Sequence, residues 1–95
     1  MPKNVNKEIQ EFIKQVKELL GIRLKRIILY GSYARGDYNK QSDVDIMILT
    51  DLSFEEIEEY RDKISDIAYD IELSTGIILS PVIKNIEKYN FLGAF

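Results

Sequence analysis

Two short runs of aliphatic residues constrain the fold of this chain more than any other feature. Residues 24–30 read LKRIILY and residues 44–50 read VDIMILT, and between them lies the polar stretch GSYARGDYNKQSD, which contains two glycines. Short runs rich in isoleucine and leucine that are bounded by turn residues are typical of buried strands. We therefore expect two strands, Leu24–Tyr30 and Val44–Thr50, joined by a loop.

Helical periodicity appears on both sides of these strands. From Val5 to Leu20 apolar residues recur at three- and four-residue spacing, with Asn4 available as an N-cap and Gly21 as a stop. After the second strand, Ser53-Phe54-Glu55-Glu56 has the S-x-x-E pattern of a capping box. It opens a long helix that is expected to run to Gly76, with the apolar face Phe54, Ile57, Ile64, Ile67, Ala68 and Ile71. The charged residues between 55 and 63 are expected to form a solvated face.

The last part of the chain predicts a third strand over Ile77–Ile83 and a final helical turn over Asn85–Asn90. Pro81 cannot donate to a strand ladder, which indicates an edge position or an irregularity. The order helix, strand, loop, strand, helix, strand predicts an α/β (α+β) fold, with helices packed on a small three-stranded sheet. At 95 residues the chain is long enough for one domain, 1–95, and too short for two.

Composition restricts the chemistry. With 13 basic and 16 acidic residues the net charge is −3, so direct nucleic-acid binding is not expected. Cysteine and histidine are absent, so a metal ion would need oxygen ligands, which suits Mg²⁺ or Mn²⁺. The sequence shows no secretory leader and no run long enough to span a membrane, so no membrane association and a cytoplasmic location are expected.

Asp43 and Asp45 are the first candidate site residues. They are separated by one residue at the start of a predicted strand, so both should point to one face while Val44 and Ile46 point to the other. Two adjacent like charges are unfavourable unless a cation or a proton neutralises them, and a divalent ion bridging triphosphate oxygens would do so. Taken alone, a D-x-D pair at a strand start is also compatible with turn and capping roles.

Gly31 and Ser32 directly follow the first strand. Glycine lets the backbone approach a phosphate, and the following amides and the serine hydroxyl can bind an anion, although a Gly-Ser turn by itself is common. Arg35 lies one helical turn beyond Ser32, and its guanidinium group suits a phosphate. Alternatively, Arg35 is a surface residue that pairs with Asp37 or with solvent.

Together these residues form one motif, GSYARGDYNKQSDVDIMIL. It resembles the motif of the DNA polymerase beta-like nucleotidyltransferase superfamily, in particular the minimal nucleotidyltransferase (MNT) domains. The resemblance includes Ala34-Arg35-Gly36 and Ser42, and it implies the nucleotidyltransferase (polymerase beta-like) fold with a mixed sheet. It further implies that Asp43 and Asp45 are catalytic metal ligands, and that the phosphate-binding set is Gly31, Ser32, Arg35 and Ser42.

The resemblance also implies an activity: transfer of a nucleoside monophosphate, with AMP from ATP as the expected case and Mg²⁺ or Mn²⁺ as cofactor. Stand-alone MNT proteins resemble antitoxins that pair with HEPN-domain toxins and add AMP to a toxin tyrosine, so a HEPN-like toxin is the expected partner. The chain departs from the family at the last core strand, where active members carry a third acidic residue. Here Ser80 is the nearest polar residue.

Two other functions stay open. The missing carboxylate is compatible with a non-catalytic antitoxin or regulatory module that binds a nucleotide or a partner, and the apolar C-terminal segment Tyr89–Phe95 is either a docking strip for it or a tail folded over the sheet. Transfer to a small molecule, as in aminoglycoside nucleotidyltransferases, would require acceptor-binding structure that this chain lacks unless it forms a homo-oligomer, which a small domain favours because more surface is buried.

Overall fold

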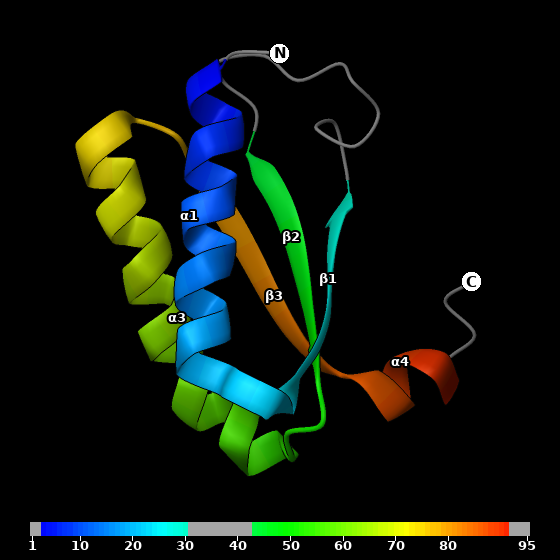
Figure 1. Cartoon of the computed structure of the whole chain (residues 1–95). Coiled ribbons are helices and arrows are strands. Elements are labelled where there is room, and N and C mark those ends of the chain that lie inside the picture. The colour runs from blue at the N-terminus through cyan, green and yellow to red at the C-terminus, as the bar shows by residue number, and fades with distance from the viewer. Residues whose placement is uncertain (1–2, 31–42, 92–95) are drawn as a thin grey trace.

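The computed structural model describes residues 3–30 and 43–91 (Figure 1). Their elements are α1 (Lys3–Leu20), the 3-10 turn η1 (Gly21–Arg23), β1 (Leu24–Tyr30), β2 (Val44–Thr50), α3 (Phe54–Thr75), β3 (Leu79–Asn85) and α4 (Ile86–Phe91). The bounds of β1 and β2 are those expected from the sequence. The predicted order of helices and strands is confirmed.

The three strands form one mixed sheet in the order β1-β2-β3. β1 pairs with β2 in antiparallel fashion, and β3 pairs with β2 in parallel after the crossover through α3. This confirms the expected α+β arrangement. Among the described strands β3 pairs only with β2, so Pro81 lies on an edge strand, as its missing N–H predicted.

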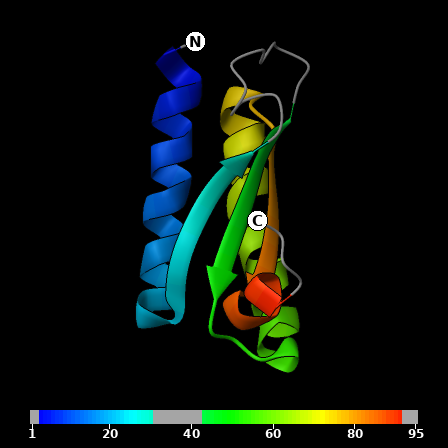
Figure 2. The same cartoon turned by 90° about the vertical axis from the view of Figure 1, so that its right-hand side faces the viewer.

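Helices α1 and α3 cover one face of the sheet and form the core with it. Val44, Ile46 and Ile48 of β2 are fully buried against this layer, together with Phe12 and Ile64 of the helices. Alternate residues of β2 point to the other face, which we call the open face. Figure 2 shows the sheet from this side, with α4 lying in front of one end of it.

Helix α3 has both of its predicted ends. The Ser53 hydroxyl accepts a hydrogen bond from the Glu56 amide at 3.2 Å, and the Glu56 carboxylate accepts one from the Ser53 amide at 2.9 Å, which completes the capping box. At the other end Gly76 has a φ of 80° and donates its N–H to the Glu72 carbonyl at 2.7 Å. Glycine adopts this left-handed conformation without a steric penalty.

Three predicted details are wrong. The third strand is Leu79–Asn85 and not Ile77–Ile83, because the first residue of β2, Val44, pairs with Leu79. Asn4, expected as an N-cap, lies inside α1, which begins at Lys3. Phe54 is 67% exposed, because at the first position of α3 it lies beyond the part of the helix that meets the core.

The final helical turn was predicted one residue early. Asn85 ends β3, and its side-chain oxygen accepts hydrogen bonds from the amides of Glu87 at 2.9 Å and Lys88 at 3.2 Å. The residue thus caps α4 instead of starting it. No helix in the described part of the chain is long and apolar enough to cross a membrane.

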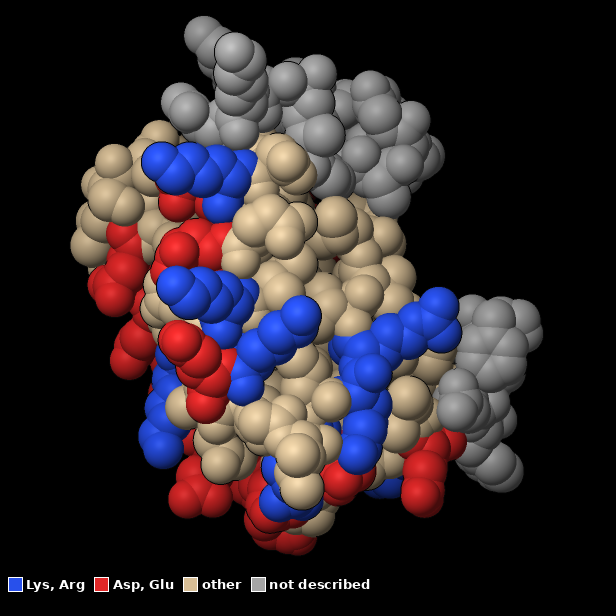
Figure 3. Space-filling view, in the orientation of Figure 1, with Lys and Arg blue, Asp and Glu red and all other residues tan. Residues whose placement is uncertain are grey.

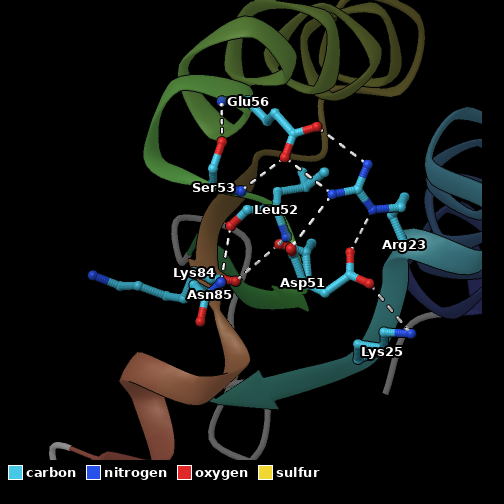
Figure 4. A network of polar contacts seen from close by, with 9 residues as sticks. Arg23, Lys25, Asp51, Leu52, Ser53, Glu56, Lys84 and Asn85 are labelled. Atoms are coloured by element: carbon cyan, nitrogen blue, oxygen red, sulfur yellow. Dashed lines mark hydrogen bonds and ion pairs between the residues drawn. The ribbon is translucent and has the colours of Figure 1, made fainter.

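An ion-pair network fastens the start of β1 to the turn between β2 and α3 (Figure 4). The Arg23 guanidinium donates to Asp51 Oδ1 at 2.5 Å and to both carboxylate oxygens of Glu56, at 3.0 and 3.2 Å. The hydrogen bond from Arg23 and the hydrogen bond from the Ser53 backbone lower the pKa of Glu56 to about 2, and Arg23 also lowers the pKa of Asp51. Glu56 is therefore a partner in this network and not a purely solvated residue.

Candidate active site

The two aspartates, Asp43 and Asp45, form an acidic pair at the N-terminal end of β2. Asp45 is the second residue of β2 and is partly exposed, and Asp43 immediately precedes the strand and is exposed. Val44 and Ile46, which alternate with them, are fully buried in the core. Because side chains alternate along a strand, the two carboxylates share the open face, as the sequence predicted.

The neighbouring strands bring two more residues into the same row. Asp45 pairs with Tyr30 of β1 on one side and with Ser80 of β3 on the other. The Ser80 hydroxyl donates a hydrogen bond to Asp43 Oδ2 at 3.0 Å. The strand register therefore places Ser80 beside both aspartates, at the position where the sequence analysis noted a missing carboxylate.

The remaining predicted site residues, Gly31, Ser32, Arg35 and Ser42, lie outside the described residues. The structure does fix the point at which the chain enters that segment. Tyr30 is the last residue of β1, and its cross-strand partner is Asp45. Tyr30, the last described residue before Gly31, thus lies on the strand next to Asp45.

The donor chemistry at this end of the sheet fits a hard divalent cation. Asp43 and Asp45 supply two carboxylates on one face, and Ser80 supplies a hydroxyl. Within residues 3–30 and 43–91 no group of three or more acidic side chains gathers that would hold a metal ion by itself. Magnesium commonly uses one or two carboxylates and completes its shell with water and substrate phosphates, so this pair is compatible with a cation that arrives with a nucleotide.

The ion-pair network was not expected from the sequence, and it lies away from the acidic pair. Arg23 precedes β1 and Asp51 follows β2, so their contact is at the end of the sheet opposite to Asp45. The β-strand rise of about 3.3 Å per residue separates Asp45 from Thr50, the last residue of β2, by roughly 16 Å. The network stabilises the scaffold and does not contact the acidic pair.

Comparison with known proteins agrees with this geometry. The sequence model of the family described as "Nucleotidyltransferase domain" matches residues 9–91. Three relatives from Methanocaldococcus jannaschii carry the name "Putative protein adenylyltransferase". The first is 37% identical over 87 residues, covering 92% of this chain and 80% of the relative. The second is 42% identical over 85 residues, covering 88% and 84%.

The third relative is 34% identical over 90 residues, with 85% of this chain and 90% of the relative covered. No solved structure gives a significant match. The family match spans most of the chain and contains the whole acidic motif, so the resemblance that the motif indicated is confirmed at the level of the family. The chain belongs to the nucleotidyltransferase domain family.

Proposed function

We propose that this chain is a metal-dependent adenylyltransferase that transfers AMP from ATP to a hydroxyl group of a partner protein. The observation that carries the proposal is the acidic pair, Asp43 and Asp45, held on the open face next to Ser80. Family membership supports nucleotidyl transfer, and the names of the relatives support a protein acceptor and AMP as the transferred group.

In the proposed reaction the acceptor oxygen forms a bond to the α-phosphorus of ATP. The bond between that phosphorus and the oxygen that bridges to the β-phosphate breaks, and pyrophosphate leaves. Asp43 and Asp45 would hold Mg²⁺ or Mn²⁺, which when bound neutralises phosphate charge and stabilises the charge that develops during transfer. Gly31, Ser32, Arg35 and Ser42 are the proposed contacts to the phosphates.

Ser80 does not accept the proton that the acceptor hydroxyl loses. A serine hydroxyl is not a base at neutral pH, so Ser80 does not replace a third carboxylate in that role. Its hydrogen bond to Asp43 instead orients that carboxylate. The proton that the acceptor hydroxyl loses would therefore pass to water or to a base on the partner protein.

The proposed partner is a HEPN-like toxin, with a toxin tyrosine as the acceptor and with this chain as its antitoxin. This setting is supported by the resemblance of the motif to MNT antitoxins. A second candidate function is a non-catalytic antitoxin that binds the toxin without chemistry. Ser80 favours this second candidate, because it stands beside the acidic pair where active members of the family carry a carboxylate.

Labelled ATP separates the two candidates. The chain is incubated with ATP labelled on the α-phosphate, Mg²⁺ and the protein encoded next to it, beside an Asp45→Asn variant. If the proposal is right, the neighbour acquires label, and Asp45→Asn reduces the rate by about 10²-fold or more, a loss typical of removing a group that stabilises transition-state charge.

The matched control is Asp62→Asn, the same substitution on the exposed face of α3. It should leave labelling unchanged. Labelling of the neighbour that proceeds equally with Asp45→Asn would contradict the proposal. Neutralisation of the toxin that survives Asp45→Asn would favour the non-catalytic antitoxin.

A further inference from the structure

A pocket of about 720 Å³ lies at the opposite end of the sheet from the acidic pair. It is bounded by the start of α3, the end of β3 and α4. Its apolar wall includes Leu52, Phe54, Ile57 and Ile83. Leu52 and Ile57 are anchored in the core, whereas Phe54 is 67% exposed beside the opening. The pocket therefore presents apolar surface to solvent on a rigid base.

Basic side chains line the same pocket. Lys84 and Lys88 are exposed, and in the described part of the chain neither of them forms an ion pair. Arg61 also contributes to the lining and is paired with Glu58, and Glu87 is the acidic residue of the lining. We call this site the basic pocket.

A further cation extends the positive charge across the sheet. Arg26 of β1 pairs with Leu49 of β2, which in turn pairs with Lys84 of β3, so Arg26 and Lys84 project from the open face in one row. Figure 3 shows Lys and Arg side chains over the region where Figure 1 places the start of β1 and α4. In a chain of net charge −3 this is a local concentration of positive charge.

The basic pocket lies within reach of the acidic pair. Ser80, which faces the aspartates, and Lys84, which lines the pocket, are four residues apart in β3, or about 13 Å at the rise of a strand. Between them on the open face lies the row of Ile28, Met47 and Val82. An extended segment of four or five residues could therefore join a carboxylate held at Lys84, at the rim of the pocket, to a hydroxyl at the acidic pair.

We infer that the basic pocket is a docking site for an acidic segment of the acceptor protein that carries a large apolar side chain. The apolar side chain enters between Phe54 and Ile83, and flanking carboxylates lie against Lys84 and Lys88. This inference rests on the proposed function for the identity of the bound protein as the acceptor. The aliphatic wall and the negative net charge favour a protein segment over a nucleic acid.

Binding is tested with a fluorescein-labelled peptide, Asp-Glu-Phe-Phe-Glu-Asp, by fluorescence anisotropy on the full chain. Two comparison peptides replace the four acidic residues by Asn and Gln, or the two phenylalanines by glycine. Both are expected to bind at least about tenfold more weakly than the acidic peptide, because each lacks one half of the recognised chemistry. Binding of the acidic peptide should also weaken with added salt.

Two pairs of variants locate the site. Lys84→Ala/Lys88→Ala should weaken binding about five- to tenfold, whereas Lys7→Ala/Lys17→Ala, which removes two exposed lysines of α1, should not change it. Phe54→Ala should weaken binding to a similar extent, whereas Leu73→Ala should not. Phe54 and Leu73 are both 67% exposed on α3. Leu73→Ala therefore controls for the loss of exposed apolar surface alone.

The inference is overturned if the acidic peptide does not bind, if both members of a variant pair weaken binding equally, or if an oligothymidylate binds more tightly than the peptide. Docking should persist in the Asp45→Asn variant, since it does not involve the acidic pair. Peptide binding without any AMP transfer would sink the proposed function and leave the docking site standing. If Lys84→Ala/Lys88→Ala does not change the rate of AMP transfer to the neighbouring protein, the docking site is contradicted and the proposed function is not.

Discussion

The side chain at position 80 sets how much negative charge gathers at the start of β2. Ser80 faces Asp45 in the parallel ladder and donates to Asp43, so it adds a neutral dipole where a third carboxylate would add a charge. With two carboxylates the chain tolerates the absence of a cation better than it would with three, because each additional like charge at close range is unfavourable.

The Ser80→Asp variant tests this role. Without divalent ions we expect the free energy of unfolding to fall by about 1 kcal/mol, because three carboxylates then repel one another in partly solvated positions. Added Mg²⁺ should raise the melting temperature of this variant more than that of the original chain. Ser80→Ala, which removes the hydroxyl without adding charge, serves as the control and should show no such gain. Equal increases of the melting temperature with Mg²⁺ in all three proteins would contradict this role of the side chain at position 80.

Glu56 should make the free energy of unfolding decrease as the pH falls into the acid range. Its pKa is lowered from 4.5 to about 2, mainly by Arg23, so its contribution is present above pH 4.5 and is lost as the pH falls towards 2. Urea midpoints measured from pH 6 to pH 2 should therefore show a difference between the original chain and Glu56→Gln that shrinks with decreasing pH. Glu55→Gln, at an exposed position in the same turn, is the control variant.

At the residue scale the sequence predicted the acidic pair and its direction but not the partners of Arg23. The shared direction of the Asp43 and Asp45 side chains could be predicted because strand alternation is a local rule. Arg23 contacts Asp51 and Glu56 across separations of 28 and 33 residues, which depend on how the chain folds back on itself. The four proposed phosphate contacts lie outside the described residues, so they remain predictions.

At the scale of elements, local sequence patterns predicted which helices and strands form better than they predicted the residues at which those elements begin and end. The strand bounds of β1 and β2 could be predicted because turn residues flank both runs. Those of β3 could not, because Ile77 and Ile78 are apolar like Leu79, and pairing begins only where Val44 meets Leu79. Phe54 was misplaced for a similar reason, since a helical pattern does not show where the helix leaves the core.

The C-terminal cap of α3 provides a test at this scale. Gly76 has a φ of 80°, and a Cβ added there would meet no atom within 4 Å, so a substitution would be unfavourable through the backbone alone. Gly76→Ala should lower the free energy of unfolding by about 1–2 kcal/mol, the usual cost of placing an L-residue in the left-handed region. Gly76→Asn should lose less, because asparagine tolerates that region better. Urea denaturation followed by circular dichroism measures both variants.

At the scale of the whole molecule, the α+β arrangement could be predicted from the order of helical and strand patterns. The strand register, which shows which residues face one another, could not. Parallel pairing of β3 with β2 brings Ser80 to Asp45 and places Lys84 four residues further along the same strand. The order of the elements alone does not fix which residue of β3 faces the aspartates. The basic pocket combines three elements and had no local pattern from which to predict it.

Ligand linkage is the test at this scale. A ligand that binds only the folded chain stabilises it by an amount set by its concentration, about 2.7 kcal/mol at one hundred times the dissociation constant. MgATP should therefore raise the melting temperature, whereas ATP with excess EDTA should raise it much less. The double variant Asp43→Asn/Asp45→Asn should lose the effect of MgATP. A MgATP response retained in that variant would show that the nucleotide binds elsewhere.

Asp45 belongs to the central strand β2 and Asp43 directly precedes it, whereas the proposed docking residues come from the edge strand β3 and the helices next to it. Asp45 is flanked by paired strands on both sides, so hydrogen-bonded neighbours fix its backbone from two directions. Under the proposed function, changes at the rim of the sheet would alter which protein is recognised while the acidic pair keeps its place. The acceptor could then change without a change in the chemistry.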